Sequence, residues 1–118
     1  MTDAARRPWP TELRLNPARN QLIVEYDSGE RFALAAEYLR VESPSAEVQG
    51  HGAGQKQIVT GKRAVTIEAL EPVGNYAVRI RFDDGHDTGL FSWDYLHELG
   101  REHAKRWAIY VEAAKHRG

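Results

Sequence analysis

The chain has 118 residues and a mass of 13.4 kDa, a size that predicts a single domain. Hydrophobic residues make up 42% and charged residues 28%, which is typical of globular proteins and excludes a wholly disordered chain. Cysteine is absent, which excludes disulfides, thiolate nucleophiles and cysteine-ligated zinc or iron–sulfur sites. The apolar runs are far shorter than the roughly 20 residues of a membrane span, and the N-terminus lacks the apolar core of a signal peptide. We therefore expect a cytoplasmic protein without a membrane partner.

The net charge of −1 conceals an uneven distribution. Residues 11–100 hold nine basic and fourteen acidic residues, whereas residues 101–118 hold five basic and two acidic residues. A basic segment is one mark of nucleic-acid binding, but an acidic body repels a phosphate backbone. We therefore interpret the basic tail as the solvated face of a helix and expect no nucleic-acid partner.

The first half of the chain predicts strands followed by a short helix. Leucines alternate with charged residues over 13–15, and a clearer alternation over 21–26 indicates a half-buried strand. The polar residues 27–29 predict a hairpin turn, after which the alternation resumes over 32–34. Good helix formers over 35–41 favour one or two helical turns.

Residues 42–63 differ in character from the segments on either side. They contain four glycines, one proline and no aromatic residue, which indicates a long and mobile loop. The first ten residues are polar and hold two prolines, so we expect them to form a flexible lead.

The second half predicts another hairpin. Residues 65–70 form a strand candidate, residues 72–75 a turn, and residues 76–82 the clearest strand, which pairs with 88–91 across a turn at 83–86. Within that turn the Asp-Gly pair suits type I′ geometry. The apolar face of the clearest strand is expected to consist of Tyr76, Val78, Ile80 and Phe82. No internal repeat is visible in the sequence.

A helical pattern occupies the C-terminal part of the chain. Ser92 is placed to cap the helix, and Asp94 lies in the first turn, where a carboxylate meets the positive end of the helix dipole. Bulky groups then recur every three to four residues, at Leu96, Leu99, His103, Trp107, Tyr110 and Ala114. Gly100 interrupts the pattern, so the segment is either one helix over 93–115 or a short helix followed by a second one from residue 101.

The densest polar cluster, DDGHDTG over residues 83–89, supports two interpretations. His86 with Asp87, or with His51 of the glycine-rich loop, is chemically suited to bind zinc or iron. Alternatively the cluster is a hairpin turn whose side chains satisfy the exposed backbone, which the spacing favours. No pair of these groups has short-range metal-ligand spacing. The glycines over 50–56 lack the Gly-Lys-Ser/Thr ending of a phosphate-binding loop.

Two stretches, LRVESPSAEVQGHG and EPVGNYAVRIRFDDGHDTGLFSWDYLHELG, carry a resemblance to a known family. Over about residues 11–100 the chain is similar to the small domain at the N-terminus of gamma-butyrobetaine hydroxylase and related dioxygenases. That domain also resembles a stand-alone bacterial family of unknown function and a C-terminal appendage of some iron–sulfur carrier ATPases. The most specific motifs are VGNYAV, DDGH and the Ser-Trp-x-x-Leu that follows them.

For the hydroxylases the resemblance implies a zinc-binding module with three cysteines and one histidine. The cysteine positions correspond here to Ser43, Ser45 and Val48, and the histidine position corresponds to His86. Serine is a poor zinc ligand and valine is none, so the chain resembles the cysteine-free bacterial form. The catalytic domain of the hydroxylases requires far more chain, and we therefore expect no dioxygenase activity.

Together these observations predict an α+β fold. We expect two β-hairpins to form one small antiparallel sheet, with one short helix and a long C-terminal helix packed on one face. The lead over 1–10 is followed by the family-like domain over 11–100 and by a helical extension over 101–118.

For function we predict a non-catalytic accessory or protein-interaction domain that needs no cofactor. Its partner is an unknown protein or, through the C-terminal helix, a second copy of the chain. The predicted interaction surface comprises Arg40, His86, Trp93, Trp107 and Tyr110. One alternative is a metal-binding domain for zinc or iron that uses His86, in connection with iron–sulfur or dioxygenase systems. Another is a small-ligand or enzyme site lined by Tyr38, Arg40, His86 and Trp93.

Overall fold

The structure, a computed structural model, describes residues 9–44, 61–87 and 89–117, and it contains two separate sheets. The first sheet is antiparallel and has the order β1-β2-β3, formed by β1 (Pro10–Leu15), β2 (Gln21–Tyr26) and β3 (Arg31–Ala35). Helix α1 (Ala36–Val41) follows it directly. The second sheet is also antiparallel and has the order β4-β5-β6, formed by β4 (Ile67–Val73), β5 (Ala77–Phe82) and β6 (Leu90–Ser92). Helices α3 (Trp93–Arg101) and α4 (His103–Arg117) complete the described fold.

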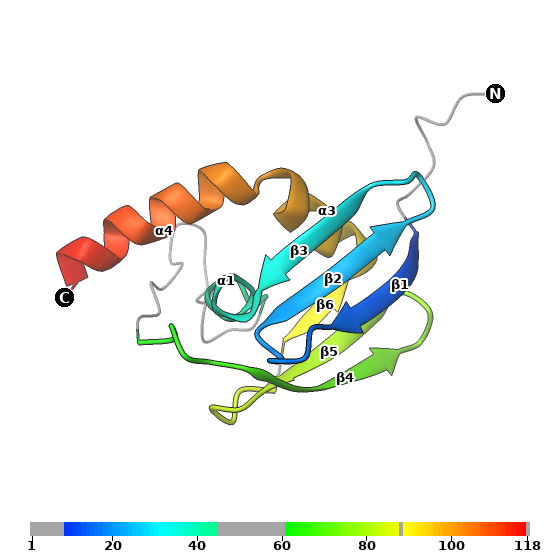
Figure 1. The fold of residues 1–118 in the computed structure, drawn as a ribbon, viewed down its shortest axis with the longest axis horizontal. Coiled ribbons are helices and arrows are strands. Elements are labelled where there is room, and N and C mark those ends of the chain that lie inside the picture. Colours follow the sequence, from blue (N-terminus) through cyan, green and yellow to red (C-terminus); the bar gives the residue numbers. More distant parts are fainter. Residues whose placement is uncertain (1–8, 45–60, 88, 118) are drawn as a thin grey trace.

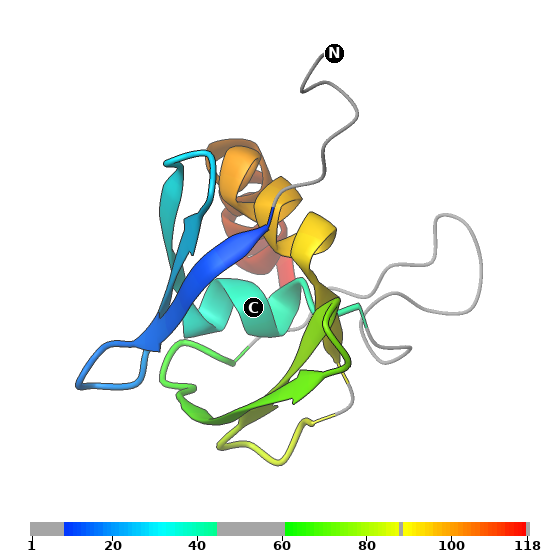
Figure 2. The same cartoon turned by 90° about the vertical axis from the view of Figure 1, so that its right-hand side faces the viewer.

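The predicted α+β class is confirmed, but the strands do not form one sheet as expected. The two hairpins lie in different sheets, each together with the strand that was expected before it, and α1 and α3 pack between the sheets (Figures 1 and 2). The sheets meet at the edge, where the N–H of Ile67 donates to the carbonyl of Arg19 at 2.8 Å. The Arg19 guanidinium returns a bond of 3.0 Å to the carbonyl of Ile67, so the two sheets are tied without becoming one.

The two sheets are built to the same plan, although no internal repeat is visible in the sequence. Leu22 pairs with Leu15 and Leu34 in the first sheet, and Val78 pairs with Pro72 and Phe91 in the same register in the second. The register shifts also correspond, between Pro10/Glu12 and between Ile67/Ala69. In each half the third strand leads directly into a helix. The likeness does not show in the sequence because few side chains are shared and because the offset between equivalent residues is one smaller for β2 and β5 than for the strands on either side of them.

The hairpin turns of the two halves have the same geometry. The N–H of Gly29 donates to the carbonyl of Tyr26 at 2.9 Å, and that of Gly85 donates to the carbonyl of Phe82 at 3.1 Å. Both glycines have positive φ, of 94° and 92°. Asp84 does not, so the predicted type I′ turn is wrong. The turn is instead a type I turn followed by a left-handed glycine, the common three-residue hairpin.

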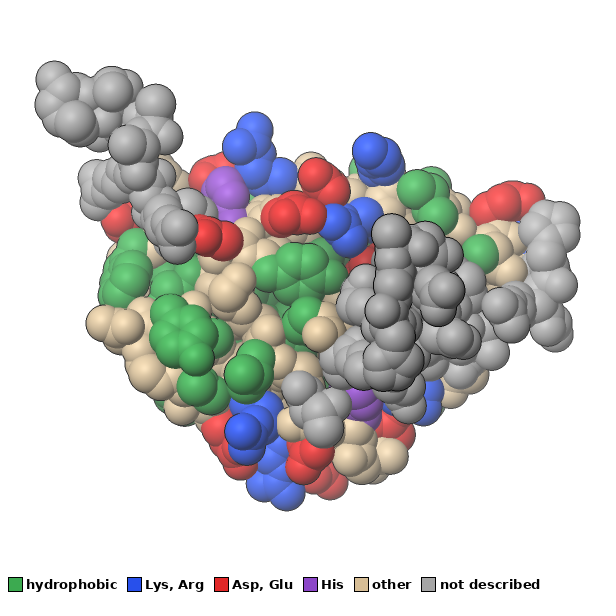
Figure 3. Space-filling view, turned by 180° about the vertical axis from the view of Figure 1, so that it is seen from behind, with side chains coloured by type: hydrophobic (Ala, Val, Ile, Leu, Met, Phe, Trp, Pro, Cys, Tyr) green, Lys and Arg blue, Asp and Glu red, His purple; other side chains and the backbone are tan. Residues whose placement is uncertain are grey.

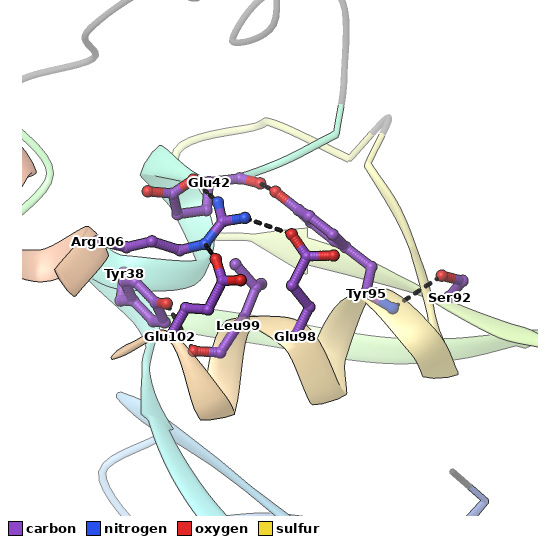
Figure 4. A network of polar contacts seen from close by, with 8 residues as sticks. All are labelled: Tyr38, Glu42, Ser92, Tyr95, Glu98, Leu99, Glu102 and Arg106. Carbon is purple, nitrogen blue, oxygen red and sulfur yellow. Dashed lines mark hydrogen bonds and ion pairs between the residues drawn. The ribbon is translucent and has the colours of Figure 1, made fainter. Parts of the chain in front are cut away.

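A reciprocal pair of hydrogen bonds joins the helices of the two halves. The hydroxyl of Tyr38 in α1 donates to the carbonyl of Leu99 in α3 at 2.6 Å. The hydroxyl of Tyr95 in α3 donates to the carbonyl of Glu42 at the end of α1 at 2.5 Å (Figure 4). Each tyrosine therefore satisfies a carbonyl near the end of the other helix, where no further turn supplies a partner.

The core lies between the inner faces of the sheets and the helices. Its largest fully buried members are Tyr38, Phe82, Phe91, Leu22, Leu34, Leu39, Ile67, Ile80, Leu96, Leu99 and Val24. Burial of Val78, Ile80 and Phe82 confirms the predicted face of β5. Tyr76 is a correction, because β4 continues to Val73 and the turn moves to residues 74–76, which leaves the ring 56% exposed.

The C-terminal helical segment is broken, as one of the two alternatives predicted. Ser92 caps α3 by accepting a bond from the N–H of Tyr95 at 3.1 Å. The break falls at Glu102 and not at Gly100, which lies inside α3. Gly100 is required for packing, because a Cβ there would lie 2.3 Å from the Phe32 ring. Within the described ranges, none of the helices combines the length and apolar character that crossing a bilayer requires.

Candidate functional site

The first candidate site is the corner between the end of α1 and the β5–β6 turn. Ser43, which is fully buried, shares a hydrogen bond of 3.0 Å between its Oγ and Nε2 of His86. Gly89 makes this approach possible, because a Cβ at that position would lie 2.3 Å from the Ser43 Oγ. The structure therefore brings together two residues that lie 43 positions apart in the sequence.

Asp84 holds the same corner together through charge. Its Oδ2 accepts bonds from Nε of Arg40 at 2.9 Å and from Nζ of Lys62 at 2.6 Å, and its Oδ1 accepts one from the N–H of His86 at 3.1 Å. Burial alone would raise the pKa of Asp84, but the bonds from Lys62, His86 and Arg40 outweigh it and lower the pKa to about 2. These contacts support the interpretation of DDGH as a hairpin turn whose side chains form hydrogen bonds with its own backbone.

The pKa of Asp84 predicts how stability depends on pH. Because the folded-state pKa lies below the unfolded value of 3.8, the contribution is complete above about pH 5 and is lost as the pH falls from about 4 toward 2. Because Asp84 lies in a turn exposed to solvent, screening limits this contribution to about 1 kcal/mol. We expect urea unfolding to show a smaller loss of stability between pH 5 and 2.5 in Asp84→Asn than in the wild type. Asp87→Asn, an exchange at an exposed neighbour, should leave the wild-type pH profile intact.

The equivalent corner of the other half is closed differently. Nε2 of His97 lies 2.6 Å from Oε1 of Glu30, and this bond is the main reason why the pKa of Glu30 is lowered. Phe32 occupies the position that corresponds to Gly89, and its ring rests on the backbone of Gly100. An aromatic ring thus fills one corner, whereas Ser43 and His86 meet in the other.

The described residues of the first corner do not provide the ligands that the predicted metal site would need. One histidine nitrogen and one serine hydroxyl meet there, whereas zinc sites use thiolate, imidazole and carboxylate ligands. In the described ranges, no group of three His, Asp or Glu side chains is arranged to hold a metal ion. His51, Ser45 and Val48 lie outside those ranges, and Asp87 is exposed.

Arg106 fastens α4 to the body of the protein, which the sequence analysis did not predict. Its guanidinium contacts Glu42 at 2.9 Å, Glu98 at 2.5 Å and Glu102 at 2.9 Å (Figure 4). It also lies over the Tyr95 ring, 5.9 Å from its centroid. Burial would lower the pKa of Arg106, but the surrounding carboxylates raise it. The Glu98/Glu102/Arg106 spacing was a usable signal, whereas nothing in the sequence indicated that Glu42 is buried.

The second candidate site is the α4 groove, which lies between α4, α1 and the segment before β4. It has a volume of about 560 Å³ and is lined by Glu37, Gly61, Arg63, Trp107, Tyr110, Val111, Ala114 and Lys115. The hydroxyl of Tyr110 donates to Oε2 of Glu37 at 2.7 Å and so joins the two helices. Burial and this bond raise the pKa of Tyr110 to about 12.

Comparison with known proteins shows to which family the chain belongs. The model of the family described as "Gamma-butyrobetaine hydroxylase-like, N-terminal" matches residues 13–97. The chain belongs to this family. It is also similar to a solution structure with 47% identity and a TM-score of 0.78, which covers 98% of this chain and 88% of that one. A second solution structure has 44% identity and a TM-score of 0.78, with coverage of 91% and 84%.

A crystal structure from Acidithiobacillus ferrooxidans is a further relative of this gamma-butyrobetaine hydroxylase-like domain. It is described as a protein of unknown function from the DUF971 family, with 41% identity, a TM-score of 0.65 and coverage of 77% of this chain and 91% of that one. No curated protein matches the chain. The predicted resemblance to this family is therefore confirmed.

The structure places the residues of the predicted interaction surface of this family member in three locations. Trp107 and Tyr110 both line the α4 groove, whereas Arg40, which is 3% exposed, lies with His86 in the first corner. Trp93 lies elsewhere and donates through Nε1 to the carbonyl of Asn75 at 2.8 Å. Tyr38, proposed with Trp93 for a ligand site, packs instead against His103 and Trp107. Hydrophobic side chains also gather on the back of the molecule (Figure 3). Among the described residues the exposed large hydrophobic side chains include those of Tyr76 and Leu90.

Proposed function

We propose that the protein is a non-catalytic protein-interaction domain whose contact surface is the α4 groove. The observation that carries this proposal is the groove itself, which has an aromatic and aliphatic floor and a volume of about 560 Å³. Binding sites of about 300–1,000 Å³ with apolar linings and a few charged groups are typical of recognition surfaces. Aromatic residues are enriched at the energetically important centres of protein interfaces.

The α4 wall of the groove is held in place by contacts within the protein. Trp107 packs against Tyr38 and Tyr110, with ring centroids 6.2 Å and 5.2 Å apart. Arg106, one residue before Trp107, anchors the helix through three carboxylates. A site with fixed walls loses little conformational entropy on binding, which favours its use as an interaction surface.

A photo-crosslinking amino acid placed at position 111 tests this function. Val111 lines the groove, whereas Lys105 is exposed on another part of α4 and provides the matched control position. We expect irradiation of cells that express the variants to give a discrete crosslinked protein from position 111 and none from position 105. The same products from both positions, or none from 111 in a folded variant, would contradict the proposal.

A further inference from the structure

We propose that the α4 groove binds a partner segment in which a large apolar side chain is flanked by carboxylates. This inference rests on the proposed function and adds the chemistry of the partner. It depends on the contrast between the apolar floor of the groove and the charges on its rim.

The floor of the groove suits an apolar side chain. Trp107, Tyr110, Val111 and Ala114 lie on successive turns of α4 and face the same hollow. Residues with this spacing form one stripe along a helix. Burial of an apolar side chain against such a stripe is the main source of affinity at a groove of this size.

The rim of the groove favours a negative charge. Arg63 and Lys115 line it and are both exposed. Within the described structure neither of these cations forms an ion pair. Glu37 is the one acidic residue of the lining, and its carboxylate already accepts the Tyr110 hydroxyl at 2.7 Å. The cations that remain select an anionic partner and repel a basic one.

Peptide titration followed by NMR tests the inference on the full chain. The probes are two blocked peptides, each with a central phenylalanine, flanked by glutamates in one and by lysines in the other. We expect the glutamate peptide to shift the indole N–H signal of Trp107, assigned with Trp107→Phe, and to bind at least about tenfold more tightly than the lysine peptide. Arg63→Glu and Lys115→Glu should each weaken this binding about fivefold or more, as should added salt.

Lys105→Glu is the matched control, because it makes the same charge change on α4 outside the groove lining. Unchanged binding in this variant supports a local effect of the rim. Equal affinity for both peptides would overturn the inference, as would tighter binding of the lysine peptide. If position 111 still crosslinks a partner in these cases, the proposed function stands and only the acidic chemistry is wrong.

Discussion

Arg106→Met is expected to lower the free energy of unfolding by about 3 kcal/mol, because it removes the guanidinium that faces a buried carboxylate. The side chain of Glu42 is 4% exposed and lies 2.9 Å from Arg106. Loss of one partner of a buried ion pair costs far more than loss of an exposed pair. Urea unfolding followed by far-UV circular dichroism measures the change. We also expect α4 to lose protection in hydrogen exchange before the sheets do.

Two further variants separate the buried contact from the exposed ones. Glu98→Gln removes an Arg106 contact whose carboxylate side chain is 48% exposed, and it should cost less than about 1 kcal/mol. Glu42→Gln combined with Arg106→Met should be less destabilised than the two single variants together, since the pair lost in the double variant is counted in each single variant. Equal losses for Glu98→Gln and Arg106→Met would show that the Glu42 contact is unimportant.

Gly100→Ala is expected to destabilise the protein by about 2 kcal/mol, although the same exchange inside an ordinary helix stabilises it by about 1 kcal/mol. The added Cβ would lie 2.3 Å from Cδ2 of Phe32, a distance that forces the ring or the helix to move. The thermal unfolding midpoint of the purified variant measures this effect.

The sign of the effect should reverse when the ring is removed. In a Phe32→Ala background, Gly100→Ala no longer meets the aromatic carbons, so the helix propensity of alanine should make the exchange neutral or stabilising. A destabilisation of the same size in both backgrounds would show that contact with Phe32 is not the reason for the glycine.

Local patterns predicted much of the fold because they depend on neighbouring residues. Alternation of apolar and polar residues placed β2 and β5, and the Ser92 cap located the start of α3. The division into two sheets was not predictable in this way, since strand alternation says nothing about which hairpins share an edge. Likewise Gly100 was interpreted as a possible helix break. The actual reason for the glycine is its close contact with Phe32, which lies on a distant strand and cannot be seen from the local sequence.

The candidate sites show the same limit. The helical stripe indicated Trp107 and Tyr110, but the groove also requires Arg63, which approaches from a segment outside α4. The family resemblance aligned Ser43 and His86 with zinc-ligand positions of the hydroxylases, and in the structure the Ser43 Oγ lies 3.0 Å from Nε2 of His86. The close approach of Ser43 to Gly89, and the ion pairs of Arg40 and Lys62 with Asp84, depend on tertiary packing that no spacing in the sequence shows.

The reciprocal bonds of Tyr38 and Tyr95 have an evolutionary consequence. Contacts in which each partner gives the other the same bond arise naturally between two identical subunits related by a twofold axis. A gene that encoded one β-β-β-α unit, and whose product formed a homodimer, would yield this arrangement after duplication and fusion. After such a fusion the two halves are encoded separately, so their sequences can change independently. The two corners of this chain now differ: one holds the Phe32 ring against Gly100, whereas Gly89 leaves room in the other for Ser43 beside His86.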